Sequence, residues 1–252
     1  MTIVRCLLMA MPLALAMCGC SPLLPNQAQG NKDILFHVST LGALMEGVYD
    51  GEITYKELKT YGDFGLGTFD KLDGEMVQVD GKVYQIKADG RAYSVNDSMK
   101  TPFAAVTFFE ADQTLHLHGP MNCAQVQEYI DNQLPTKNIL YAIKVEGDFK
   151  YVKARSVPQQ EKPYPKLVDA MKNQVIFEFH NAQGTMVGFR LPAYMEHINV
   201  PGYHLHFINA DRRAGGHVHE CRVKNVKIEI DYMSRFLMTL PDSNEFYKVD
   251  LN

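Results

Sequence analysis

The 252-residue sequence contains no tryptophan, only five cysteines and no cluster of basic residues. Its 25 Lys and Arg residues nearly balance 29 Asp and Glu residues, so the formal net charge is only −4. A chain of this charge, without a Lys/Arg run, lacks the positive surface that would attract a nucleic acid. Thirteen tyrosines and thirteen phenylalanines supply the aromatic content, which is typical of a strand-rich globular protein. The length allows one large domain or two modest ones.

The N-terminal apolar segment, Cys6 to Met17, is too short to span a bilayer comfortably. It follows a single basic residue, Arg5, and ends in small residues and cysteines, a pattern typical of a secretory signal. A buried N-terminal helix is the alternative, but Pro12 interrupts the segment and a polar stretch follows it. We therefore predict a signal peptide at residues 1–20 and a tether at residues 21–33.

The stretch Met17-Cys18-Gly19-Cys20 resembles a bacterial lipoprotein box. Cleavage before Cys20 would leave this cysteine as a lipidated N-terminus. Simple secretion with cleavage nearby is the alternative, because Met17 and Cys18 match the box weakly. The sequence thus indicates an exported protein, either secreted or held in the envelope by a lipid anchor that is its only contact with a membrane.

Two cysteines, Cys123 and Cys221, lie in the globular part of the chain. Neither belongs to a CxxC pair, so a thiolate zinc site is not indicated. In an oxidising compartment the two could form a disulfide, but two buried free thiols fit the sequence equally well. The sequence alone leaves this choice open.

Strand and turn signals fill the globular part. Asp80-Gly81, between Met76–Val79 and Lys82–Ile86, is a type I′ hairpin signal. A second hairpin is predicted for the apolar runs on either side of Gly147-Asp148, and separate short strands are expected to flank Asn181–Gly184. Two further short strands are expected at Gly216–Val223 and Val226–Tyr232. The pattern therefore predicts many short strands.

Residues 34–252 are accordingly predicted to form one α+β domain, strand-rich, with two mixed or antiparallel β subdomains and a few short helices. Clustered strands with few helices argue against alternating β–α–β units. The clearest helix signal is Cys123–Gln133, which is amphipathic. The proline-rich stretch places the boundary between the two subdomains near residues 157–166.

Three histidines in the C-terminal part form the most informative pattern. His204 and His206 are two residues apart, so on a strand they project from the same face. The turn at Asp211–Gly216 reverses the chain, and a hairpin of this length brings His217 beside the pair. Three imidazoles on one sheet face, with a fourth position open, are the arrangement of a catalytic zinc site.

Two other histidine patterns compete with this interpretation. His116 and His118 form a second pair at the same spacing, but no third ligand follows them, so a solvated strand face is the better interpretation. His219 shares a strand face with His217, and a fourth ligand, a supporting group and a merely exposed side chain are all compatible with the sequence.

The segment GYHLHFINADRRAGGHV, residues 202–218, resembles the metal-binding signature of the alpha-acetolactate decarboxylase family. Both the His pair and the Gly-Gly-His continuation match that signature. Further stretches that resemble the family are 65–69, 72–75, 141–143, 152–158, 160–164 and 187–192. The resemblance extends from residue 34 to residue 252.

The resemblance implies a role for each matching residue. His204, His206 and His217 would bind Zn²⁺, Glu75 and Arg155 would be the catalytic pair, and Thr68 would line the substrate pocket. The implied reaction is decarboxylation of 2-acetolactate, a small molecule, to acetoin and carbon dioxide. Zinc would withdraw charge as the bond breaks, Arg155 would fix a substrate oxygen, and Glu75 would protonate one face of the enediolate. No organic cofactor is implied.

One departure from the family pattern concerns the C-terminus. Family members continue into an acidic tail whose glutamate reaches the site, and the sequence, which ends at Asn252, offers no matching position. This departure and the export signal also fit a non-catalytic zinc-binding envelope lipoprotein. A zinc hydrolase is a further alternative, although no HExxH helix is present. A homodimer is left open.

Overall fold

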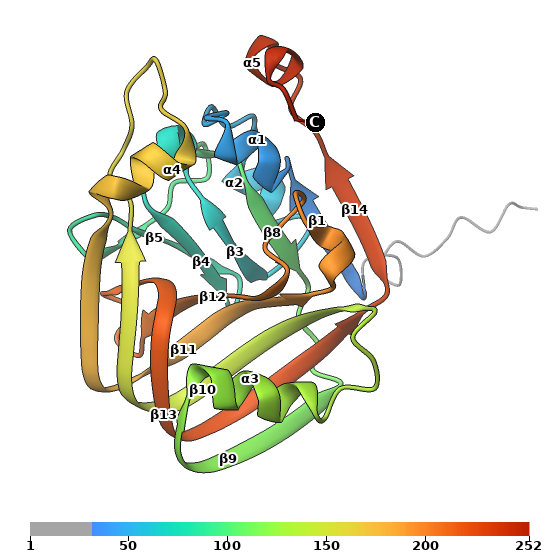
Figure 1. Cartoon of the computed structure of the whole chain (residues 1–252), viewed down its shortest axis with the longest axis vertical. Coiled ribbons are helices and arrows are strands. Elements are labelled where there is room, and N and C mark those ends of the chain that lie inside the picture. Colours follow the sequence, from blue (N-terminus) through green and yellow to red (C-terminus); the bar gives the residue numbers. More distant parts are fainter. Residues whose placement is uncertain (1–31, 252) are drawn as a thin grey trace, which may run out of the picture. The chain divides into compact units, whose positions relative to one another are not determined.

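The computed structural model describes residues 32–251, which are built around two main β-sheets (Figure 1). The predicted signal peptide, with Cys20, and most of the predicted tether lie outside these residues. The described residues belong to one compact unit. None of the helices in this part of the chain is long and apolar enough to cross a membrane.

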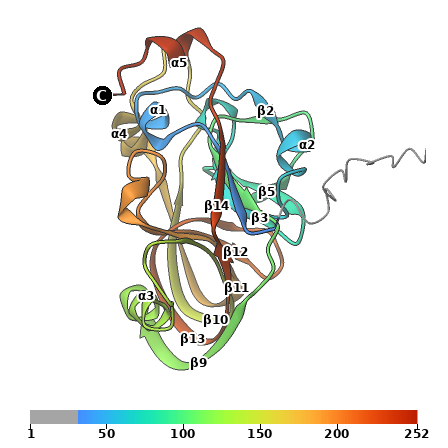
Figure 2. The same cartoon turned by 90° about the vertical axis from the view of Figure 1, so that its right-hand side faces the viewer.

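Seven strands form the first sheet. They are β1 (Ile34–Val38), β3 (Phe64–Thr68), β4 (Glu75–Val79), β5 (Lys82–Ile86), β6 (Ala92–Ser94), β8 (Ala104–Thr107) and β14 (Arg235–Thr239). Their order is β14-β1-β8-β3-β4-β5-β6, with β14 parallel to β1, as Figure 2 shows, and all other pairs antiparallel. Asp80 and Gly81 both have positive φ, which confirms the hairpin predicted between β4 and β5. A separate two-stranded ladder pairs β2 (Ile53–Thr54) with β7 (Lys100–Thr101).

Five strands, most of them long, form the second sheet. They are β9 (Gln113–Asn122), β10 (Leu140–Ser156), β11 (Val175–Leu191), β12 (Gly202–Asn209) and β13 (Gly215–Met233). The order is β10-β11-β12-β13-β9, every pair is antiparallel, and β10 also pairs with β13. The strands β10 to β13 therefore close into a ring, in which the beginning of β13 lies between β12 and the end of β10.

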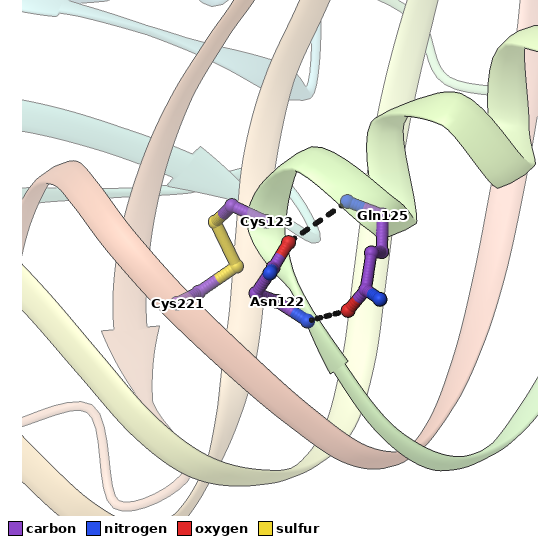
Figure 3. The surroundings of a disulfide bond; sticks show 4 residues. All are labelled: Asn122, Cys123, Gln125 and Cys221. Carbon is purple, nitrogen blue, oxygen red and sulfur yellow. Dashed lines mark hydrogen bonds between the residues drawn. A yellow bond between two sulfur atoms is a disulfide. The ribbon is translucent and has the colours of Figure 1, made fainter.

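The helices among the described residues are short. They are α1 (Leu41–Met45), α2 (Tyr55–Leu58), α3 (Cys123–Asp131), α4 (Leu167–Ala170) and α5 (Asn244–Lys248), with 3₁₀ turns at Asp70–Leu72, Met171–Asn173 and Ala193–Met195. The helix α3, predicted as Cys123–Gln133, begins at a capping box in which Asn122 and Gln125 exchange hydrogen bonds (Figure 3). Its buried face, Val126 and Ile130, packs on the second sheet.

A disulfide joins Cys123, the first residue of α3, to Cys221 in β13 (Figure 3). The two cysteines are 98 positions apart in the sequence, with a Cα–Cα distance of 5.0 Å. The pairing that the sequence left open is therefore present, and it ties α3 to the sheet on which the helix packs.

The two sheets share one hydrophobic core. Leu66 and Val77 of the first sheet belong to the same buried cluster as Val187, Phe189 and Ile208 of the second. All five side chains are completely shielded from solvent. This shared core holds β4, which carries Glu75, against β12, which carries His204 and His206.

The strand-rich α+β class is confirmed, but the predicted short strands are wrong in three places. The structure has one strand, β10, instead of a hairpin at Gly147-Asp148, and one strand, β11, through Asn181–Gly184. The segments on either side of Asn225, expected as separate strands, are likewise joined in β13. The ladder of β10 and β13 shows register shifts near Asp148 and Asn225, so these turn-forming residues bend the strands as bulges do and do not reverse them.

The proline-rich stretch also has a different role from the one expected. Residues 157–166 connect β10 to α4 and β11, and both β10 and β11 belong to the second sheet. The chain passes from the first main sheet to the second between β8 and β9, and it returns to the first between β13 and β14. The expected boundary therefore does not coincide with a change of sheet, because the strands before and after it, β10 and β11, pair with each other.

Candidate active site

The three predicted histidines lie together on the β12–β13 hairpin. His204 and His206 project from one face of β12, while Leu205 and Phe207 enter the core on the other face. His217 is the register partner of His206 across the hairpin. One ring nitrogen from each of the three histidines lies within 4.8 Å of the others. The hairpin geometry expected from the spacing is therefore confirmed.

The positions of these nitrogens fit a metal ion. Nε2 of His206 lies 3.2 Å from Nδ1 of His217, and two ligands of a tetrahedral ion at zinc–nitrogen distances should be about 3.3 Å apart. Burial lowers the pKa of His206 to about 3 and the pKa values of His204 and His217 well below the usual range. The imidazoles are therefore neutral at pH 7, which is the form that binds metal.

Glu75 and Arg155 form an ion pair beside the histidines. Arg155, the last but one residue of β10, is the register partner of His217, and its Nη1 donates to Oε1 of Glu75. The other carboxylate oxygen, Oε2, lies 3.5 Å from Nε2 of His206. Burial raises the pKa of Glu75 and the Arg155 charge partly offsets this shift. The predicted catalytic pair is thus brought into contact with the predicted metal ligands.

Thr68 fixes the turn that presents Glu75. It is the register partner of Glu75 in the β3–β4 hairpin, and its hydroxyl donates to the carbonyl of Gly74 at 2.7 Å. Its side chain is buried and borders the same cavity as Glu75. The hydroxyl oxygen keeps lone pairs that can still accept a hydrogen bond.

These groups line one cavity of about 260 Å³. Its polar side is made by the three histidines, Glu75, Arg155 and Thr68. Its apolar side includes Leu41, Leu44, Leu72, Phe103, Leu167 and Val200. The apolar side chains, which the sequence did not single out, come from α1, α4 and connecting segments that lie far apart in the chain. A small ligand with methyl groups and several oxygens fits such a division.

The competing histidines lie elsewhere. His116 and His118 are exposed on β9, as the solvated-face interpretation predicted. His219 is exposed, its ring centroid lies 5.8 Å from that of His217, and it is not part of the nitrogen cluster. Among the described residues, the group of His204, His206 and His217 is the one that could hold a metal ion.

Two residues behind the site had no predicted role. Asn199 contacts His204 through Oδ1, and His37 contacts Asn199 through Nε2. Both side chains are fully buried, and burial lowers the pKa of His37 to about 4. The only signal in the sequence is that His37 interrupts an otherwise apolar strand, because polar residues at such positions usually have a buried partner.

Comparison with known proteins agrees with this geometry. The family model for alpha-acetolactate decarboxylase matches residues 35–252. The alpha-acetolactate decarboxylase of Methanosarcina mazei is 52% identical over 229 residues, which cover 91% of this chain and 80% of that protein. The Bacillus subtilis protein of the same name is 41% identical, with 89% and 90% of the two chains covered.

The fold agrees as well. The crystal structure of alpha-acetolactate decarboxylase from Bacillus subtilis superposes with a TM-score of 0.86 at 42% identity. The match covers 87% of this chain and 94% of that one. With the family model matched over nearly all described residues and the relatives covered over most of their length, the chain belongs to the alpha-acetolactate decarboxylase family.

Proposed function

We propose that the protein decarboxylates 2-acetolactate to acetoin and carbon dioxide with a zinc ion at His204, His206 and His217. The observation that carries this proposal is the direct contact of the Glu75–Arg155 pair with the histidine cluster inside one cavity. A protein that only stored metal would need neither of these side chains. Membership of the family and the names of its relatives support the same reaction.

Arg155 is suited to hold the substrate. Its guanidinium borders the cavity, and its Nε is buried without a hydrogen-bond partner among the described residues. A buried unpaired donor is costly unless a ligand oxygen completes it. Charge-assisted hydrogen bonds from this group would orient a carboxylate or carbonyl oxygen of the substrate. A bound zinc ion would supply Lewis-acid polarisation of the substrate oxygens.

Glu75 is suited to move a proton. Its pKa is raised by burial, which brings a carboxyl group closer to the pH at which it can both donate and accept. Loss of carbon dioxide from the substrate leaves an enediolate, which needs one proton on carbon. Because the carboxyl is fixed by Arg155 on one side of the cavity, delivery from this side alone would give a single enantiomer of acetoin.

The catalytic test compares the unsubstituted protein with Glu75→Gln and Arg155→Lys in acetoin release from 2-acetolactate. Gln keeps the shape of Glu75 but is no carboxylic acid, and Lys keeps the charge of Arg155 but not its planar fork. We expect both variants to retain metal and to lose about 10²-fold or more in turnover. Chiral chromatography should show reduced enantiomeric purity for Glu75→Gln.

Two results would contradict this assignment. Unchanged turnover and purity in zinc-loaded variants would remove Glu75 and Arg155 from the chemistry. A zinc-loaded unsubstituted protein that releases no acetoin would favour the non-catalytic metal-binding alternative.

The metal is tested separately by elemental analysis. We expect about one zinc ion per chain, as for a single three-histidine site, and loss of both metal and activity in His217→Ala. The matched control is His116→Ala, which removes an exposed histidine of the second pair. Metal lost from the control and kept by His217→Ala would place the site elsewhere.

We further propose that the protein is exported and lipid-anchored through Cys20. The disulfide between Cys123 and Cys221 supports export, because such bonds persist in oxidising compartments. Cys20→Ser should abolish lipid labelling and release active protein in soluble form. Labelling that persists in this variant would rule out Cys20 as the anchor.

A further inference from the structure

A chain of buried hydrogen bonds runs from the histidine cluster to the first strand. Nδ1 of His204 lies 3.0 Å from Oδ1 of Asn199, and Nδ2 of Asn199 lies 2.9 Å from Nε2 of His37. The last of these hydrogen bonds joins Nδ1 of His37 to the carbonyl oxygen of Ser39, at 3.0 Å. Asn199 and His37 have 0% exposed surface, so water cannot replace any of these partners.

The orientation of the Asn199 amide follows from a fourth contact. The backbone N–H of Val200 lies 2.7 Å from Oδ1 of Asn199. A backbone N–H can only donate, so the atom that faces it must be the amide oxygen. The oxygen therefore faces Val200 and His204, and the NH₂ group faces His37. The reversed amide would set two donors against each other beside Val200.

The orientation of this amide determines where each histidine carries its proton. The NH₂ group of Asn199 donates, so Nε2 of His37 accepts and the proton of His37 is on Nδ1, where the Ser39 carbonyl accepts it. At the other end the amide oxygen accepts, so His204 carries its proton on Nδ1. Nε2 of His204 is then left with a free lone pair. With this assignment, each of the four contacts joins one donor to one acceptor.

We infer that Asn199, held by His37, is a positioning residue that fixes His204 in the Nδ1–H tautomer and leaves Nε2 to bind the metal. This inference rests on the proposed metal centre. His206 is held in the same tautomer by a different group, because its Nδ1 lies 2.7 Å from the carbonyl oxygen of Met76. The opposite sheet thus acts on both ligands of β12: β4 contacts His206 directly, and β1 acts on His204 through Asn199.

Loss of the contact between Asn199 and His204 should weaken metal binding. A metal-binding histidine commonly donates its other N–H to a fixed acceptor, and loss of that acceptor typically weakens metal binding 10- to 100-fold. Without Asn199, His204 would be free to rotate and to change tautomer. Metal affinity should fall even though all three ligands remain.

The first experiment reads the tautomers directly in the metal-free, unsubstituted protein. Long-range ¹H–¹⁵N correlation spectra distinguish a protonated from an unprotonated ring nitrogen for each histidine. We expect His37, His204 and His206 to be neutral, with the proton on Nδ1. A proton on Nε2 of His204 would overturn the inference. A protein that binds no zinc would contradict the proposed function, while these spectra would still decide the orientation of His204.

The second experiment measures zinc affinity by chelator competition and the visible spectrum of the cobalt-substituted protein. Asn199→Leu removes all polar contacts, and we expect affinity to fall 10- to 100-fold with a changed cobalt spectrum. Asn199→Asp keeps the oxygen acceptor and should restore most of the affinity. The matched control is Asn209→Leu at the far end of β12, where Oδ1 accepts from the backbone N–H groups of Arg213 and Ala214. Parent-like affinity in Asn199→Leu would overturn the inference.

Discussion

Glu75 and Asp231 are both buried carboxyl groups, but their surroundings differ. Glu75 has the guanidinium of Arg155 as a partner. Asp231, 1% exposed, accepts one hydrogen bond from the backbone N–H of Glu110, and its Oδ1 has no partner among the described residues. Burial, reinforced by Asp112 and other nearby acidic groups, raises the pKa of Asp231 to about 7. Asp231 is therefore a source of instability at neutral pH.

This raised pKa gives a pH-dependent prediction for Asp231→Asn. Between pH 4 and pH 7 the folded state binds more protons at Asp231 than the unfolded state, so the parent loses stability as the pH rises. The variant has no such group. We expect the two proteins to have similar unfolding free energies at pH 4, and the variant to be more stable at pH 8 by up to about 4 kcal/mol.

Denaturant titrations of both proteins at the two pH values check this expectation. A difference in unfolding free energy that does not change with pH would show that Asp231 ionises freely in the folded state.

For single residues of the candidate site, the sequence predicted some and not others. His204 and His206 could be placed on one face because strand periodicity is local, and His217 because a short turn precedes it. Glu75, Arg155 and Thr68 required the family resemblance, since nothing near them in the sequence distinguishes them from surface residues. Asn199 and His37 could not be connected, because their contact joins residues 162 positions apart.

Among the elements, Gly147 explains why β10 continues where a hairpin was predicted. Its φ is +142°, and a Cβ added there would lie 2.3 Å from the carbonyl oxygen of Asn225 in β13. The glycine is needed for the close approach of two backbones at a bulge, not for a reversal. A Gly-Asp pair in a sequence is compatible with a bulge and with a reversal. Only the pairing of Gly147 with Val226 of β13, a strand far along the sequence, decides between them.

Gly147→Ala should therefore destabilise the protein strongly. The side chain would meet both an unfavourable φ and a backbone contact, so we expect a loss of about 2–5 kcal/mol in unfolding free energy. The matched control is Gly81→Ala, where φ is +72° but a Cβ would have nothing within 4 Å. The control should lose only about 1–2 kcal/mol. Thermal or denaturant unfolding measures both losses. If the two variants lose equal unfolding free energy, the backbone at Asn225 moves away from the added Cβ without destabilising the protein.

At the level of the whole molecule, the disulfide closes a long loop between α3 and β13. It joins positions 98 apart, and cross-linking a loop of this length stabilises the folded state by about 5 kcal/mol in the chain-entropy model. We expect Cys123→Ser to lower the Tm by roughly 10 °C. Activity at 25 °C should persist, because neither cysteine borders the cavity.

A reductant supplies the control for this experiment. Dithiothreitol should lower the Tm of the parent to that of Cys123→Ser and leave the variant unchanged. A parent whose Tm is insensitive to complete reduction would show that α3 is held by its packing alone.

The three histidines share the β12–β13 hairpin, but Glu75, Met76 and His37, which hold them directly or through Asn199, come from the other sheet. The complete site therefore exists only when both sheets have met. A metal ion that binds only this assembled state stabilises it by an amount that grows with the logarithm of the free metal concentration. Metal supply would then control how much intact protein survives proteolysis, and not only how much of it is active. At a low supply of the metal, fewer copies of the protein would remain, at an unchanged rate of synthesis.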